Sequence, residues 1–177
     1  MIMSIDRKAY YLLIGFFYCI VHLMSGQDQR IADSLSKVYQ NDRLAGLEKL
    51  ELLRNLAFNE LSDLELSKRY AEELIALSKL ENNNLYLFRG YYQKGSIYIN
   101  AGDLEIALDA YFKGLETASK AAYLEGEGSA YYAIADVYSV MGNSDNAEEY
   151  YNKAIQILRK ADDSVSLATA LLNTGEY

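Results

Sequence analysis

The side chains best suited to nucleophilic or metal chemistry are scarce in this sequence and lie near its start. The 177 residues contain one cysteine, Cys19, and one histidine, His22. Both precede residue 27, so the rest of the chain offers no thiol and no imidazole for a catalytic nucleophile, a disulfide or a Cys or His metal site. These residue types predict neither a catalytic triad nor a metal centre.

Adjacent carboxylates and short polar loops are the remaining candidates for chemistry. Two carboxylate pairs lie in predicted helices, Glu72-Glu73 and Glu148-Glu149. Consecutive helix side chains point about 100° apart, so neither pair can act as an acid/base pair. The segment 125–128 contains two glycines but lacks the strand and the Lys-Ser/Thr pair of a phosphate-binding loop. Asp103 and Asn143 lack a calcium-loop pattern and are predicted helix caps. We expect no catalytic residue, no metal and no cofactor.

These features belong to a helix pair that recurs with a period of forty residues. Nine residues recur when the sequence is shifted by forty: Tyr91, Tyr92, Tyr98, Gly102, Ala107, Tyr111, Lys113, Lys120 and Ala121. Tyr91, Gly95 and Tyr98 lie at helical spacing and predict a first helix with one apolar face. Gly102 is expected to end this helix in the left-handed conformation, before a second helix begins at Asp103. One such pair cannot bury both of its apolar stripes alone, so the copies must stack into a solenoid.

At these positions the sequence resembles the tetratricopeptide repeat family. The matching residues are Tyr91, Gly95, Tyr98, Gly102, Ala107, Tyr111 and Gly114, and then Tyr131, Ala135, Tyr138, Gly142, Ala147, Tyr151 and Ala154. The chain departs from the family in its period, forty instead of about thirty-four, and in having no proline. Helices longer than usual, as in the extended repeats of bacterial regulatory proteins, would account for both differences. The resemblance implies an all-α fold, a right-handed α-α superhelix.

The repeat divides the chain into six segments. They are a signal peptide at 1–26, a leading helix at 27–43, a degenerate first repeat at 44–84, a second repeat at 85–124, a third repeat at 125–164 and the start of a truncated fourth repeat at 165–177. In the leading helix, four apolar residues are expected on one side: Ile31, Leu35, Val38 and Tyr39. In the first repeat, five leucines lie at helical spacings: Leu47, Leu50, Leu53, Leu56 and Leu61.

The fourth repeat stops at Tyr177, in the middle of a predicted helix. The sequence therefore predicts that the natural chain continues beyond this residue. Four residues are expected to form an exposed apolar face that a further helix would cover: Ile155, Leu158, Leu171 and Leu172.

The first 26 residues are typical of an export signal. Arg7 and Lys8 precede an apolar run at 9–21, and Ser25 and Gly26 supply a small-residue exit. The run is shorter than the roughly twenty residues that a membrane span needs, which favours a cleaved signal over an uncleaved anchor. We therefore predict export to the periplasm or to the outer face of the inner membrane, with a mature chain that begins near residue 27.

The net charge of −8 bears on the kind of partner. An acidic surface disfavours nucleic acid and anionic membranes as partners of this segment. The acidic residues are interpreted as solvated helix faces in preference to a dedicated site for a basic partner. We therefore expect a protein or peptide partner, and the sequence leaves the oligomeric state open.

In tetratricopeptide repeat proteins, the first helix of each pair lines a concave groove that binds extended peptides or partner helices. The resemblance implies eight groove residues: Arg89, Tyr92, Gln93, Ser96, Asn100, Tyr132, Asp136 and Ser139. Tyr92 and Tyr132 recur at the forty-residue period, and a rigid amphipathic ring suits a contact residue. Packing of helix on helix is the alternative role for both.

Two functions fit these features. The order of export signal, leading helix and repeats resembles the front of bacterial sensor kinases, cyclases and transcriptional regulators, in which a membrane span and an output domain follow. The first hypothesis is therefore a non-catalytic interaction module that forms the extracytoplasmic sensory region of a longer signalling protein. The alternative is a free periplasmic or secreted scaffold.

Overall fold

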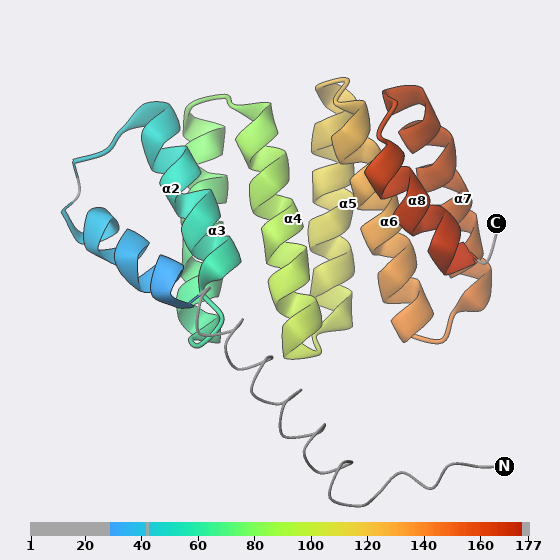
Figure 1. The fold of residues 1–177 in the computed structure, drawn as a ribbon, viewed down its shortest axis with the longest axis horizontal. Helices are drawn as coiled ribbons and strands as arrows, with labels where there is room; N and C mark the ends of the chain where they lie inside the picture. Colours follow the sequence, from blue (N-terminus) through green and yellow to red (C-terminus); the bar gives the residue numbers. More distant parts are fainter. Residues whose placement is uncertain (1–28, 42, 175–177) are drawn as a thin grey trace, which may run out of the picture.

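This computed structural model describes residues 29–41 and 43–174 (Figure 1). These residues form eight helices, joined by short turns, and no strand. A helix over residues 29–40 comes first. The others are α2 (Gly46–Asn59), α3 (Leu64–Leu80), α4 (Asn84–Ala101), α5 (Leu104–Lys120), α6 (Leu124–Val140), α7 (Ser144–Ala161) and α8 (Ser164–Thr174). Each of the helices α2 to α7 packs on the next helix in the chain, so the predicted all-α solenoid is confirmed.

The turn inside each of the second and third helix pairs is closed by a glycine. Gly102 has φ +82° and Gly142 has φ +74°, so both adopt the predicted left-handed conformation. A Cβ atom added at either position would meet nothing within 4 Å, so backbone conformation alone favours glycine there. Asn143 then caps α7 by accepting a hydrogen bond from the Asn146 amide at 3.2 Å.

Asp103 was predicted to cap α5, and its side chain makes no capping hydrogen bond. The helix begins with a backbone bond from the Ala107 amide to the Asp103 carbonyl at 3.0 Å. Asp103 is exposed, so water can satisfy the amides that the carboxylate leaves unbonded.

The turns between pairs also recur every forty residues. Asn82, Ala122 and Asp162 all have positive φ, between +52° and +57°. An L-residue pays roughly 1–2 kcal/mol in this conformation, and only Asn and Asp adopt it with some ease. The periodic backbone therefore persists although the three side chains differ.

The leading helix packs a face that shares Leu35 and Tyr39 with the predicted one but not Ile31 and Val38. Ile31 and Val38 are 43% and 42% exposed, whereas Ala32 is fully buried. The contact row is Ala32, Leu35 and Tyr39, in which the Tyr39 hydroxyl donates to Glu73 at 2.6 Å. This hydrogen bond to a carboxylate is the main reason that the pKa of Tyr39 rises to about 12. This hydrogen bond joins the leading helix to α3.

The end repeats bury only part of their expected apolar residues. Leu50, Leu53 and Leu56 have no exposed surface, but Leu47 and Leu61 are 62% and 56% exposed. A helix at the end of a solenoid has a neighbour on fewer sides, so residues at the margins of its stripe stay in contact with water.

The predicted apolar face at the other end is largely covered by α8. Ile155 and Leu158 are buried, against Ala170 and the half-buried Leu171. Only Leu172 remains well exposed, at 57%. The prediction that Ile155 and Leu158 await a further helix is therefore wrong, because α8 already packs on them. Residues 175–177, where the chain was predicted to stop in mid-helix, lie outside the described residues.

Replacing Ser78 with alanine should raise the free energy of unfolding by about 1 kcal/mol. Ser78 is fully buried in α3, and its hydroxyl has no hydrogen-bond partner among the described residues. Alanine occupies the equivalent position one repeat later, at Ala118, where it is also fully buried.

Urea denaturation would check this prediction, with Ser67→Ala as the matched control. Ser67 is buried in the same helix, but its hydroxyl donates to the Ala57 carbonyl at 3.0 Å. The control should therefore destabilise the chain, and a loss of stability in Ser78→Ala as well would contradict the argument.

Candidate protein-binding groove

A cavity of about 300 Å³ opens between α2 and α4, beside the start of α3. Its lining residues are Ala57, Phe58, Glu60, Leu61, Leu64, Ser67, Tyr92, Gln93, Ser96, Ile97 and Asn100. Four of the eight predicted groove residues are among them: Tyr92, Gln93, Ser96 and Asn100. Because α2 and α4 are the first helices of consecutive pairs, the cavity lies on the face where the sequence predicted a groove.

One wall of the cavity is apolar and exposed, and the other is polar. Phe58, Leu61 and Leu64 are 60%, 56% and 40% exposed. Across from them, Gln93 and Asn100 offer amide groups that can both donate and accept hydrogen bonds. An apolar side paired with amide groups suits a peptide, which presents side chains and backbone together.

The apolar wall stands on a turn that Glu60 holds in place. The Glu60 side chain is nearly buried and accepts from the Ser62 and Asp63 amides at 3.1 and 3.0 Å and from the Ser62 hydroxyl at 2.8 Å. These bonds order the connection from α2 to α3, which carries Leu61. From sequence, Leu61 was predicted only as one of five leucines at helical spacings and not as part of a binding site.

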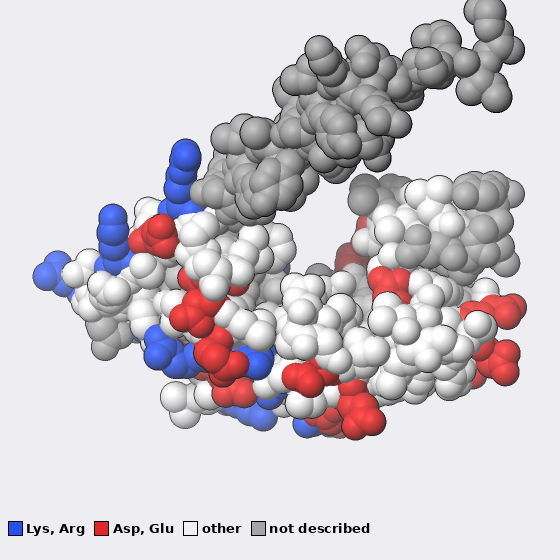
Figure 2. All heavy atoms as spheres, turned by 90° about the horizontal axis from the view of Figure 1, so that it is seen from below, with Lys and Arg blue, Asp and Glu red and all other residues white. Residues whose placement is uncertain are grey.

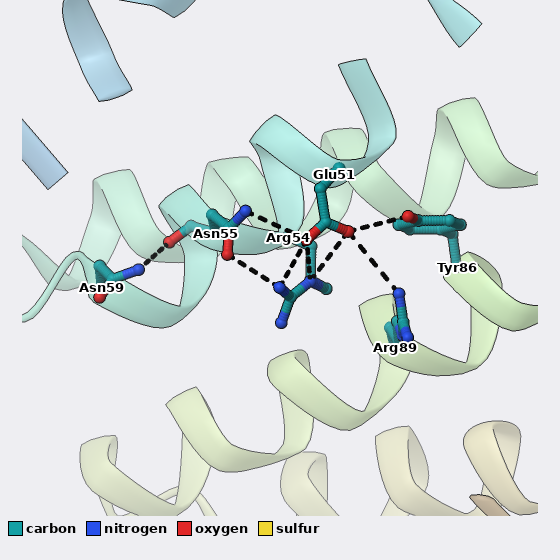
Figure 3. Close-up of polar contacts among 6 residues, drawn as sticks. All are labelled: Glu51, Arg54, Asn55, Asn59, Tyr86 and Arg89. Carbon is teal, nitrogen blue, oxygen red and sulfur yellow. Dashed lines mark hydrogen bonds and ion pairs between the residues drawn. The ribbon is translucent and has the colours of Figure 1, made fainter. Parts of the chain in front are cut away.

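Arg89, the first predicted groove residue, lies outside the cavity lining and against α2 (Figure 3). Its guanidinium is 3.7 Å from Glu51 and lies over the Tyr86 ring at 4.9 Å. Glu51 also accepts from the Tyr86 hydroxyl at 2.8 Å and from Arg54 at 2.6 Å. Arg89 therefore takes part in joining α4 to α2.

Glu51→Gln should destabilise the chain at pH 7 and much less near pH 2. Hydrogen bonds from Arg54, and after them from Tyr86, lower the pKa of Glu51 from 4.5 to about 2. A lowered folded-state pKa gives stability that is present above pH 4.5 and lost as the pH falls towards 2. Since the side chain is 41% exposed, we expect only about 0.2–1 kcal/mol.

The check is urea denaturation of both proteins at pH 7 and at several values below 4.5. Tyr86→Phe removes one donor to the carboxylate, so it should act in the same direction with a smaller effect. An equal difference between wild type and Glu51→Gln at every pH would contradict this role of the charge.

The other predicted residues form one arrangement that occurs twice. In the second repeat the Tyr111 hydroxyl bonds the Ser96 hydroxyl at 3.1 Å, and the ring lies 5.3 Å from Tyr92. Forty residues later the Tyr151 hydroxyl donates to Asp136, and its ring lies 5.7 Å from Tyr132. Tyr92 and Tyr132 are half-buried. Each therefore packs on the second helix of its pair and still presents part of its ring.

The electrostatics of this arrangement follow from burial. Burial, and after it the charge of Asp136, raises the pKa of Tyr92. The same two causes, in the same order, raise the pKa of Tyr132 to about 12. These phenols stay neutral hydrogen-bond donors at physiological pH. The last predicted residue, Ser139, is exposed near the end of α6 and does not line the cavity.

Charge is unevenly distributed over the face that Figure 2 shows. Lys and Arg side chains lie toward the end formed by the N-terminal helices, whereas the opposite end shows Asp and Glu. Within residues 29–41 and 43–174, no group of three or more His, Cys, Asp or Glu side chains could hold a metal ion. No helix in that same part of the chain is long and apolar enough to cross a membrane.

Comparison with known proteins identifies the repeats. Residues 88–123 and 126–177 match models of the tetratricopeptide repeat. The solved structures that resemble this one include BtubC (BKLC) from P. vanneervenii, at 16% identity and a TM-score of 0.66, over 85% of this chain and 63% of that one. The apo form of RapI also resembles it, at 15% identity and a TM-score of 0.67, over 92% of this chain and 64% of that one. No curated protein matches the sequence.

The fold is therefore an α-α superhelix, and residues 88–123 and 126–177 are tetratricopeptide repeats. Repeats of this class bind proteins or peptides, so this part of the chain is a protein-interaction module. At 15–16% identity the likeness to the two structures concerns the fold. The chain spans a little under two thirds of the length of each of them.

Proposed function

We propose that this chain binds an extended protein or peptide segment along the face formed by α2, α4 and α6, without catalysing a reaction. The observation that carries the proposal is the cavity between α2 and α4, where exposed Phe58, Leu61 and Leu64 face Gln93 and Asn100. Covering an exposed apolar wall of this kind with a partner's side chain lowers the free energy, because apolar surface is removed from water. The opposing amides can bind the partner's backbone.

The test is a selection of peptides from a random displayed library against the chain, followed by affinity measurements on variants. Leu61→Lys places a charge in the apolar wall and should weaken the selected peptides at least tenfold. Leu80→Lys is the matched control, because Leu80 is 78% exposed and lies outside this cavity. Peptides that bind both variants as tightly as the wild type would contradict the groove.

We further propose that the module is the exported sensory region of a longer bacterial signalling protein. The support is the charged start, apolar run and small-residue exit of residues 1–26, which lie outside the described residues, together with the resemblance of the segment order to such proteins. The alternative remains a free periplasmic or secreted scaffold, which would bind partners with the same groove.

Two measurements separate these proposals. N-terminal sequencing of protein from the producing cell should give a mature start near residue 27, and an intact Met1 in a soluble cytosolic fraction would overturn export. The reading frame after Tyr177 then discriminates between the sensory region and the scaffold. A second apolar span followed by an output domain supports the former, and a stop codon supports the latter.

A further inference from the structure

The glutamate that joins α2 to α4 is shared by two arginines, which leaves positive charge in excess. Glu51 lies between the guanidiniums of Arg54 and Arg89, at 2.6 and 3.7 Å (Figure 3). Among residues 29–41 and 43–174, no other carboxylate forms an ion pair with either guanidinium. One negative charge therefore faces two positive charges, and one positive charge is left without a carboxylate.

Both guanidiniums keep hydrogen-bond donors that the described residues do not use. Arg54 donates through Nε and Nη2 to Glu51 and Asn55, whereas its Nη1 donates to no described residue. Arg89 donates no hydrogen bond to a described residue, because its 3.7 Å contact with Glu51 is too long and its contact with Tyr86 is with the ring. The two arginine side chains are 31% and 35% exposed, so a partner can reach these donors.

The two arginines adjoin the cavity of the proposed groove. On α2, Arg54 lies four residues before Phe58. On α4, Arg89 lies four residues before Gln93. Side chains at this spacing lie on one face of a helix, one turn or about 5.4 Å apart. Because Phe58 and Gln93 both line the cavity, the excess positive charge lies beside it on the same two helices.

A side-chain carboxylate is the group that these donors fit. A guanidinium presents paired N–H donors whose spacing matches the two oxygens of a carboxylate. The residues described as lining the cavity include no Lys or Arg and one carboxylate, Glu60, which accepts three hydrogen bonds from the next turn. The cavity therefore suits an apolar side chain and the arginines an acidic one. In an extended segment, residues two positions apart point to the same side and lie about 7 Å apart, which is close to one helical turn.

We propose that Arg54 and Arg89 form a subsite for the side-chain carboxylate of an Asp or Glu, two positions from the apolar residue held in the cavity, on the segment that the groove binds. The inference rests on the proposed function and specifies the partner's chemistry. The net charge of −8 repels acidic peptides in general. A preference for an acidic residue must therefore come from the local excess of positive charge.

The test is an NMR titration of the full chain with two peptides, acetyl-Glu-Ala-Leu-Ala-Glu-amide and its neutral counterpart acetyl-Gln-Ala-Leu-Ala-Gln-amide. Each carries its polar side chains two positions to either side of the leucine, so both directions of binding are covered, and neither has a terminal carboxylate. The glutamate peptide should shift the backbone amides around Glu51, Arg89 and Gln93 saturably. It should bind about threefold more tightly than the glutamine peptide.

Two variants separate this binding role from the role of the arginines in joining the helices. Glu51→Gln removes the carboxylate that competes for the guanidiniums, so the glutamate peptide should bind about threefold more tightly. A purely structural role predicts no gain. Arg89→Gln should abolish the preference for the glutamate peptide. Lys94→Gln is the matched control and should leave the preference unchanged, because Lys94 lies on the same helix, pairs with Glu72 at 3.2 Å and does not line the cavity.

Three results would each overturn the subsite: equal affinities or no saturable shift in the wild type, no gain in Glu51→Gln, or a preference that survives Arg89→Gln. If Arg89→Gln does not fold by circular dichroism, the Glu51→Gln result decides. The proposed function has its own test, because selected peptides that do not depend on Leu61 would contradict the groove whatever the two defined peptides do.

Discussion

Leu158→Ala should lower the free energy of unfolding by about 2–5 kcal/mol, the largest effect that we expect from one substitution. Leu158 has no exposed surface and belongs to the cluster that joins α7 to α8 through Ala154, Ile155 and Ala170. Truncation removes its transfer free energy and leaves a cavity that packed helices close only in part. Urea denaturation followed by circular dichroism would measure the loss.

Gly128 provides an internal check on that contact. A Cβ atom on Gly128 would lie 2.6 Å from Cγ and Cδ2 of Leu158, so Gly128→Ala alone should destabilise the chain. In the Leu158→Ala background the same methyl group enters the space that the leucine left. The double variant should therefore be more stable than the sum of the single changes predicts, by about 0.5–3 kcal/mol. Strict additivity would show that the two residues do not meet as described.

The forty-residue period was sufficient to predict the solenoid and the left-handed glycines of two of its turns from sequence. Gly102 and Gly142 are informative because a left-handed helix end favours glycine over every other residue. The left-handed conformation shared by Asn82, Ala122 and Asp162 could not be predicted, because their residue types vary while their backbone conformation does not. A pattern in residue identity reveals a turn only where the backbone restricts the side chain.

The rotation of the end helices could not be predicted in the same way. Spacing alone allows Ile31 and Val38 to face the core as well as Ala32 does. In the structure the helix is joined to α3 by contacts that spacing does not report, among them the hydrogen bond from Tyr39 to Glu73, thirty-four positions apart. The same limit applies to α8, which covers Ile155 and Leu158 although its own sequence is short and weakly patterned.

For the candidate site, the family resemblance predicted the residues of α4 that line the cavity, but not the residues of α2 and the turn after it. Tyr92, Gln93, Ser96 and Asn100 fall on the strongest repeat and were predicted together. Phe58 and Leu61 lie in a degenerate repeat, and neither was predicted as a groove residue. Only the structure shows that they are more than half exposed beside α4. The exposure of a side chain depends on how closely the neighbouring helix packs, and the residue pattern of one helix does not contain that information.

Ala107→Leu should lower the free energy of unfolding by roughly 1–3 kcal/mol. Ala107 has no exposed surface and lies in the cluster that joins α5 to Ala133, Ile134 and Val137 of α6. Protein interiors are close-packed, so three additional carbon atoms can enter only if the helices separate or a side chain leaves its preferred rotamer. Each of these changes costs free energy, because α5 packs on both α4 and α6.

The control is Ala76→Leu on the exposed side of α3, which should change the free energy of unfolding by no more than about 0.5 kcal/mol. Both variants would be compared with the parent by urea denaturation, using the midpoint and the slope together, since overpacking that loosens the stack would lower the slope as well. Ala147 occupies the equivalent position forty residues later and is also buried, so Ala147→Leu should show the same sign. If Ala107→Leu unfolds at the parent's urea concentration, then α5 does not pack closely at Ala107, and the stacking that forms the groove would have to be reassigned.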